Sequence, residues 1–196
     1  MKNVLTFILL FGCLNATIAQ TSKGQWVIGG STSFSTEKIK YSGGGMSATE
    51  DGPSKFNFAP QVGTFLMDNL AVGLVIDIQS ETTKESSGSS TITYTESTSL
   101  FGPFVRYYMG SGNIRFFGEG AFGFGNSKSK AGTTSESYSL SGYRLSAGPA
   151  IFFGDNASLE ATLGYRSVGN TQKEQGQTYR ISYNSFGLNV GFRIYL

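Results

Sequence analysis

The last stretch of the chain, SFGLNVGFRIYL, alternates strictly between large apolar residues and small or polar ones. Every second residue from Phe186 to Leu196 is apolar, whereas Gly187, Gly191 and Arg193 lie among the residues between them. Side chains of a β-strand point alternately to opposite faces. The segment therefore predicts a strand with one apolar face and one face of small and polar groups.

Similar alternation recurs along the chain and predicts eight strands, at residues 25–35, 55–66, 69–80, 95–108, 113–125, 139–153, 157–167 and 179–196. Short turn sequences at 67–69, 110–112 and 154–156 alternate with long polar segments, expected to be loops, at 37–54, 81–92, 126–136 and 168–177. Outer-membrane barrels have short periplasmic turns and long external loops. The pattern predicts an all-β fold, an eight-stranded antiparallel up-and-down transmembrane β-barrel.

Three prolines interrupt the predicted strands at equivalent positions, each shortly before a tight turn: Pro60, Pro103 and Pro149. Proline has no N–H to donate to a ladder and is normally excluded from interior strands. We expect each to lie at a β-bulge or at a place where one ladder hydrogen bond is missing.

The charges indicate which face of each strand points inward. Charged residues make up only 14% of the chain, against roughly 25% in soluble domains. A solvated surface would carry many more charges, mostly Lys and Glu, whereas the interior of an eight-stranded barrel holds packed side chains. We therefore expect the apolar face to meet lipid and the small face to carry a structural network of interior charges: Asp77, Arg106, Glu119, Arg144, Glu160, Arg166 and Arg193.

Aromatic residues near the strand ends are expected to form the interfacial girdles of a membrane barrel, at Trp26, Phe34, Phe65, Tyr107, Tyr108, Phe152, Phe153, Tyr165, Tyr183 and Tyr195. The same assignment of faces predicts that Arg at Leu74 or Leu163 is poorly tolerated. A change on the opposite face, such as Gly73→Ser, is expected to be much milder.

The first residues form a separate unit. The chain begins with a short basic region at Lys2, followed by an apolar run that is too short to span a bilayer. Residues 17–19 include the small residues that signal peptidase cleavage requires. We expect residues 1–19 to be a signal peptide and residues 20–196 to be the barrel domain. Two alternatives are a buried N-terminal helix and a lipoprotein cleavage before Cys13, the only cysteine.

Three segments resemble the small outer-membrane β-barrel proteins of the OmpX/OmpA-like superfamily, especially the versions common in Bacteroidetes. They are FAPQVGTFLMDNLAVGLVI, FGPFVRYYMGSGNIRFFGEGAFGFG and the C-terminal GLNVGFRIYL. The resemblance covers essentially the whole chain after the signal peptide. It implies the barrel fold and the outer membrane of a Gram-negative bacterium, and it is porin-like in fold without specifying an activity.

The composition excludes several kinds of chemistry. The chain has no His and no Cys after Cys13, so the commonest general base, metal ligand and thiolate nucleophile are absent. Glu119 and Glu160 could pair as acid and base, but their arginine neighbours favour a structural role. We expect no enzyme, cofactor or metal site, and a net charge of +2 gives no reason to expect nucleic acid.

Three functions remain open: a structural or surface-interaction barrel acting through its external loops, a narrow porin-like channel, or a secreted soluble ligand-binding barrel. The first is favoured. Its expected partners are outer-membrane lipid and lipopolysaccharide, the barrel assembly machinery during biogenesis and an unknown extracellular partner, and the protein is expected to be a monomer.

The mature protein is predicted to begin at Gln20 and to be recovered in the outer-membrane fraction. Intact-protein mass spectrometry of that fraction checks both points. A lipidated Cys13 at the N-terminus would contradict the predicted cleavage, and recovery in the soluble periplasm without detergent would contradict the lipid-facing assignment.

Overall fold

A computed structural model describes residues 21–43, 46–87, 90–131, 134–174 and 177–196. The predicted signal peptide lies outside these residues. The strands are β1 (Trp26–Gly43), β2 (Met46–Met67), β3 (Leu70–Ser87), β4 (Ser90–Met109), β5 (Ile114–Ala131), β6 (Thr134–Phe153), β7 (Ala157–Glu174) and β8 (Gln177–Tyr195). Within the described ranges there is no helix long and apolar enough to cross a bilayer.

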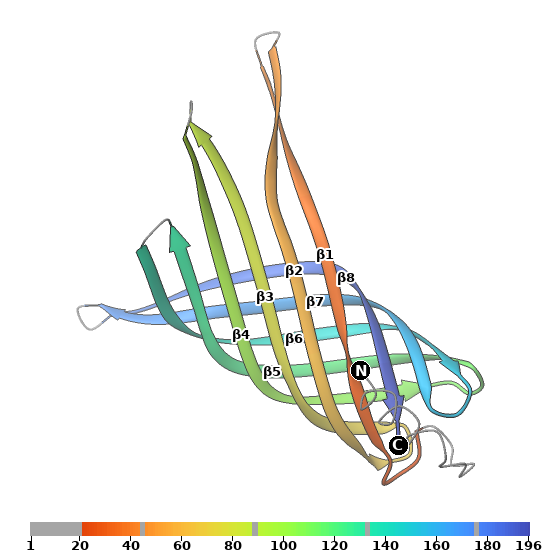
Figure 1. Cartoon of the computed structure of the whole chain (residues 1–196). Helices are drawn as coiled ribbons and strands as arrows, with labels where there is room; N and C mark the ends of the chain where they lie inside the picture. The colour runs from red at the N-terminus through yellow and green to blue at the C-terminus, as the bar shows by residue number, and fades with distance from the viewer. Residues whose placement is uncertain (1–20, 44–45, 88–89, 132–133, 175–176) are drawn as a thin grey trace, which may run out of the picture.

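Each strand pairs antiparallel with its neighbours in chain order, and β1 pairs with β8 to close the barrel (Figure 1). The predicted eight-stranded up-and-down barrel is confirmed. The three short turns lie between β2 and β3, β4 and β5, and β6 and β7. Their backbone reaches positive φ at Asn69, Gly110, Gly112 and Gly154, a conformation that Gly and Asn adopt most readily.

The strands are much longer than the alternation predicts. The four polar segments expected to be loops belong largely to strands, and the β3–β4 ladder continues as far as Ser87–Ser90. The prediction of long loops was wrong because ladder hydrogen bonds join backbone groups and need no apolar side chain. In Figure 1 the four hairpins flare away from one another beyond the closed part of the barrel.

The prolines lie in β2, β4 and β6, and each leaves a short gap in the ladder to the next strand. The β2–β3 ladder passes from Phe58–Ile78 directly to Gln61–Val75 without a shift of register, while Pro60 keeps its place opposite Gly30 in the β1–β2 ladder. Equivalent gaps, also without a shift, lie beside Pro103 and Pro149. Of the two expected solutions, the structure shows the missing ladder bond and not the bulge.

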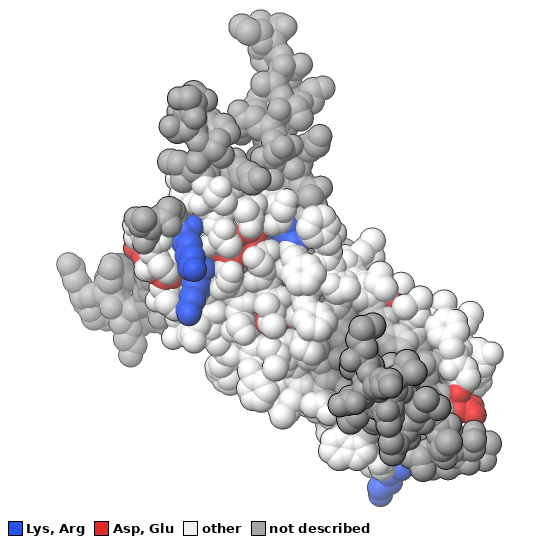
Figure 2. Space-filling model, in the orientation of Figure 1, with Lys and Arg blue, Asp and Glu red and all other residues white. Residues whose placement is uncertain are grey.

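The apolar face of each strand points outward. On β8, Leu188 is 76% exposed and Phe186 is 69% exposed, whereas Arg193 on the opposite face is 1% exposed. On the face shown in Figure 2 the body of the barrel is almost uncharged, and charged side chains lie mainly toward its ends. An apolar belt of this extent is suited to lipid and not to water. It contradicts the soluble ligand-binding alternative.

Four of the residues expected in the aromatic girdles are inside the barrel. Phe65, Tyr108, Phe152 and Tyr195 belong to a buried cluster near the short turns, together with Phe117. The girdle prediction was wrong for them because nearness to a strand end does not specify which face a side chain occupies. Five other predicted girdle residues are exposed: Trp26, Phe34, Tyr107, Phe153 and Tyr183.

The structure also contradicts the expectation that Gly73→Ser is mild. A Cβ atom at Gly73 would collide with the carbonyl oxygen of Val62 and would lie 2.5 Å from the Cα atom of Gly63. Neighbouring strands approach too closely there for any side chain. Gly187, on the inward side of β8, has open space around the same position.

Leu74→Arg and Leu163→Arg are each predicted to lower the free energy of unfolding by about 2–4 kcal/mol, because they place a charge in the lipid-facing belt. Gly187→Ser is the matched inward control and should change it by no more than about 0.5 kcal/mol. Urea unfolding in lipid vesicles measures all three. Equal tolerance of the outward and inward changes would mean that the faces are reversed.

Candidate functional site

Side chains fill the barrel lumen in layers. Nearest the short turns is an aromatic layer, which consists of Phe65, Tyr108, Phe117, Phe152 and Tyr195. The next layer outward is an ionic layer, which consists of Arg106, Glu119, Glu160 and Arg193. Cavities lie beyond it, toward the long hairpins. The inward side of the alternation supplies all of these side chains.

The ionic layer is almost fully buried, and each carboxylate in it contacts both arginines. Arg106 lies opposite Glu119 in the β4–β5 ladder and donates from Nε to its Oε2 over 2.8 Å. Arg106 Nη1 reaches Glu160 Oε1 at 2.6 Å, and Arg193 Nε lies 3.0 Å from both oxygens of Glu160. Arg193 Nη2 closes the ring on Glu119 at 3.4 Å.

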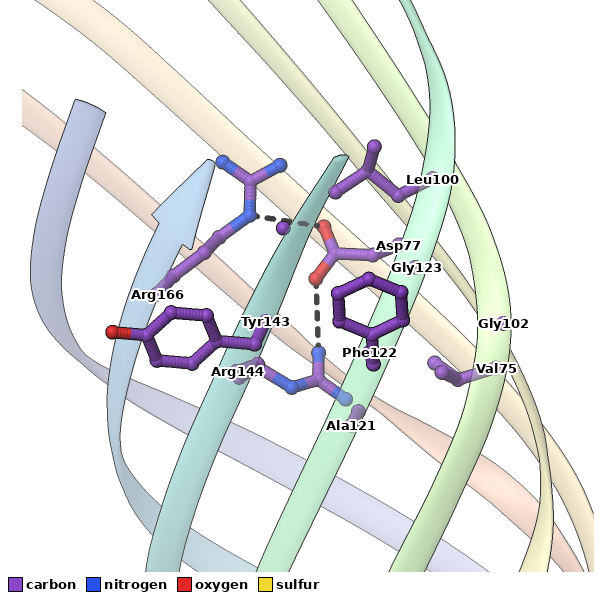
Figure 3. A pocket seen from close by; sticks show the side chains of 11 residues that line it. Val75, Asp77, Leu100, Gly102, Ala121, Phe122, Gly123, Tyr143, Arg144 and Arg166 are labelled. Atoms are coloured by element: carbon purple, nitrogen blue, oxygen red, sulfur yellow. Dashed lines mark hydrogen bonds and ion pairs between the residues drawn. The ribbon is translucent and has the colours of Figure 1, made fainter. Parts of the chain in front are cut away.

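The network continues outward through Glu119. Its Oε1 accepts from Arg144 Nη2 at 3.1 Å and from Gln61 Nε2 at 2.9 Å. Arg144 Nη1 then donates to Asp77 Oδ2 at 3.1 Å, and Arg166 Nε lies 3.6 Å from Asp77 Oδ1. Figure 3 shows Asp77 between these two arginines, beside a small cavity of about 20 Å³.

The structure therefore brings all seven residues of the expected interior network together. Sequence reasoning missed the neutral members. Gln61 is buried on the inward side of β2. The sequence could have indicated it, because it is a polar residue on the face of segment 55–66 that carries the small residues. Tyr108 joins the two layers, because its hydroxyl accepts from Arg106 Nη1 at 3.0 Å and lies 3.0 Å from the hydroxyl of Tyr195.

On the side of the short turns, the ionic layer packs against aromatic rings. Arg106 Cζ lies 3.9 Å from the centre of the Phe117 ring, a cation–π arrangement. The Tyr195 hydroxyl is also 2.9 Å from Ser158 Oγ. Through these contacts the aromatic and ionic layers pack directly against each other and fill the lumen.

Glu119 and Glu160 are poorly placed for acid–base chemistry. Glu119 is 6% exposed and Glu160 is 2% exposed, and arginines occupy their oxygens. A general acid or base must reach a substrate atom, and these carboxylates reach only the protein. Within the described residues, no group of three or more Asp, Glu, His or Cys side chains could hold a metal ion.

Two polar cavities occupy the outer half of the lumen. The larger, about 140 Å³, is bordered by Asp77, Arg144 and Arg166 and by polar residues of β1, β2 and β8. The second, about 90 Å³, lies on the other side of Gln79 and Arg166 and includes Glu81 and Glu96 in its wall. The lumen is thus packed toward the short turns and partly open toward the hairpins.

Comparison with known proteins identifies one family. A model described as the outer membrane protein beta-barrel domain matches residues 5–196. No curated protein matches the chain.

Several solved structures share the fold at low sequence identity. The N-terminal β-barrel domain of Pseudomonas aeruginosa OprF is 12% identical, with a TM-score of 0.52 over 89% of this chain and 98% of that one. OprG from the same organism is 14% identical, with a TM-score of 0.51 over 91% and 99%. Neisserial surface protein A is 14% identical, with a TM-score of 0.51 over 88% and 97%.

Glu119→Ala is predicted to lower the free energy of unfolding by about 3–5 kcal/mol, because it leaves buried arginines without their shared carboxylate. Urea unfolding in detergent or lipid measures the change. Asp155→Ala, in an exposed turn, is the control and should stay within about 0.5 kcal/mol of the wild type. Similar values for the two variants would show that the network contributes little stability.

Proposed function

The chain belongs to the outer membrane protein β-barrel family, and from this premise we propose that it is a closed, non-enzymatic barrel whose role is exercised by its long hairpins at the cell surface. It is a protein of the outer membrane. In such barrels the short turns face the periplasm and the long connections face the exterior. The flared hairpins are therefore the part of the chain that meets the surroundings of the cell.

The observation that carries the proposal is the closed lumen. The ionic layer and the aromatic layer lie one behind the other, and the side chains of Arg106, Tyr108 and Tyr195 are at most 2% exposed. An ion would have to break several buried ion pairs and then displace packed rings. Such a lumen supports a structural or surface role rather than conduction.

The composition and the placement of the buried carboxylates support the non-enzymatic part of the proposal. The chain contains no His, and its most buried carboxylates are held by arginines. The expected partners remain lipopolysaccharide and outer-membrane lipid around the belt, the assembly machinery during insertion, and an extracellular partner at the hairpins. A monomer is the expected state, because the ladder closes within one chain.

A narrow channel is the second candidate, and the two outer cavities favour it. The larger one reaches Arg144, which contacts Glu119 of the ionic layer. The second lies beside it, on the other side of Arg166. For conduction, however, the ionic and aromatic layers would both have to rearrange.

Single-channel recording in planar bilayers separates the two functions. The wild-type protein is predicted to give no steady current, and Glu119→Ala is predicted to destabilise the barrel more than it changes permeability, because the aromatic layer remains. A porin inserted in the same bilayer controls for the assay. Steady, ion-selective currents from the unmodified protein would establish the channel instead.

The surface role is tested with a variant in which residues 39–50, the end of the β1–β2 hairpin, are replaced by a short Gly-Ser turn. The variant should fold and insert like the wild type, because the closed part of the barrel is untouched. Cells that display it should lose adherence to a host-cell layer relative to cells that display the wild type. Unchanged adherence for the corresponding variants of all four hairpins would contradict the surface-interaction role.

A further inference from the structure

The larger outer cavity lies where the wall of the barrel opens. In the part of the chain that the structure describes, the β1–β8 ladder runs only from Val27–Tyr195 to Thr32–Val190. Beyond that pair the two strands diverge (Figure 1). Ser33 of β1 and Ser185 and Asn189 of β8 line the cavity, so it borders this unpaired part of the seam.

The cavity carries an excess of positive charge. Its charged lining residues are one acid, Asp77, and three cations, Lys55, Arg144 and Arg166. Asp77 is shared between two arginines, at 3.1 Å from Arg144 and 3.6 Å from Arg166. Arg144 also contacts Glu119 at 3.1 Å, so Arg166 is the arginine of this cavity whose ion pairing among the described residues rests on Asp77 alone.

Arg166 has unused hydrogen-bond donors. Its Nη1 donates to Gln79 Oε1 at 2.7 Å. Its Nε and Nη2 are buried and have no hydrogen-bond partner among the described residues. Nε has Asp77 Oδ1 at 3.6 Å, an ion pair that is longer than a hydrogen bond, whereas Nη2 has no such contact among the described residues. A buried guanidinium N–H without an acceptor is unfavourable.

The nearest other carboxylates have partners of their own. Glu81 and Glu96 face Arg166 across the second cavity. Glu81 lies 3.8 Å from Lys55 Nζ. Glu96 accepts from the Tyr138 hydroxyl at 2.6 Å and from Ser127 Oγ at 2.8 Å. Among the described residues Nη2 of Arg166 therefore has neither a hydrogen-bond acceptor nor an ion-pair partner, and Arg166 lines the larger cavity.

We infer that the larger cavity binds a small oxyanion, namely a phosphate, sulfate or carboxylate group, with Arg166 as the principal donor and Arg144 adding positive charge. Guanidinium groups match the planar spacing of oxyanion oxygens. The cavity volume of about 140 Å³ is several times the roughly 10–15 Å³ that one water requires. The anion can be free in the external medium or be the phosphate of an outer-leaflet lipid at the open seam, and neither source requires conduction.

The test is a titration of ¹⁵N-labelled full-length protein in dodecyl maltoside, a detergent without charge, followed by NMR of the arginine Nε–H signals. One arm adds inorganic phosphate, and the other adds phosphatidic acid in mixed micelles. The Arg166 signal, assigned by its absence in Arg166→Gln, should shift and saturate in at least one arm.

A second variant keeps the test decisive if Arg166→Gln does not fold. Asn189→Asp adds a carboxylate to the cavity at nearly constant shape and should weaken binding by about tenfold or more, because the new charge competes with the anion. Arg115→Gln, near the short turns, removes an arginine that contacts Thr21 and the Phe152 ring and should leave binding unchanged.

Saturation with inorganic phosphate supports a site for a free anion, and saturation with phosphatidic acid alone supports a site for a lipid phosphate. Changes that do not saturate in either arm, or that are the same in wild type and Asn189→Asp, would overturn the inference.

Discussion

The apolar outer face imposes the constraint on which the remaining structure depends. A backbone N–H or C=O group that faces hydrocarbon has no water to bind, so every strand within the membrane needs a partner on each side. The β1–β8 ladder meets this requirement between Val27–Tyr195 and Thr32–Val190. Farther out, where the hairpins leave the closed part, the two strands separate.

The strand prolines are compatible with this constraint because each disturbs only one of its two ladders. Pro60, Pro103 and Pro149 keep a register partner on the side of the preceding strand. The residue before each is small, and a Cβ on Gly102 or Gly148 would collide with a carbonyl oxygen of the next strand. The gaps therefore coincide with close approach of neighbouring backbones, and the barrel wall stays continuous.

Closure of a barrel this narrow leaves no room for water at the level of the ionic and aromatic layers, and that explains the arrangement of the charges there. Glu119 stands at the centre, where Arg106, Arg144 and Arg193 all reach it. A buried carboxylate is tolerable only with such partners. The same contacts close the lumen on the periplasmic side. Arg166, at the outer end of the network, lines an open cavity, and its Nη2 has no hydrogen-bond partner among the described residues.

The sequence by itself determined the number of strands, the short turns, the outward direction of the apolar face and the set of inward charges. These follow from period-two alternation and from composition, which are local properties. The sequence did not determine how far the hairpins extend, because pairing in a polar hairpin leaves no alternation of apolar side chains. It also did not show that Tyr108 and Tyr195 belong to the lumen rather than to a girdle.

Only the tertiary structure decided which side chains meet inside the barrel. Glu119 and Glu160 share Arg106, although they are 41 positions apart in the chain, because closure brings β5 and β7 to the same height around the lumen. The open seam and the cavity beside Arg166 arise in the same way, from where two distant strands stop pairing. Contacts across a closed sheet depend on register and closure together, and the pattern within any one strand specifies neither.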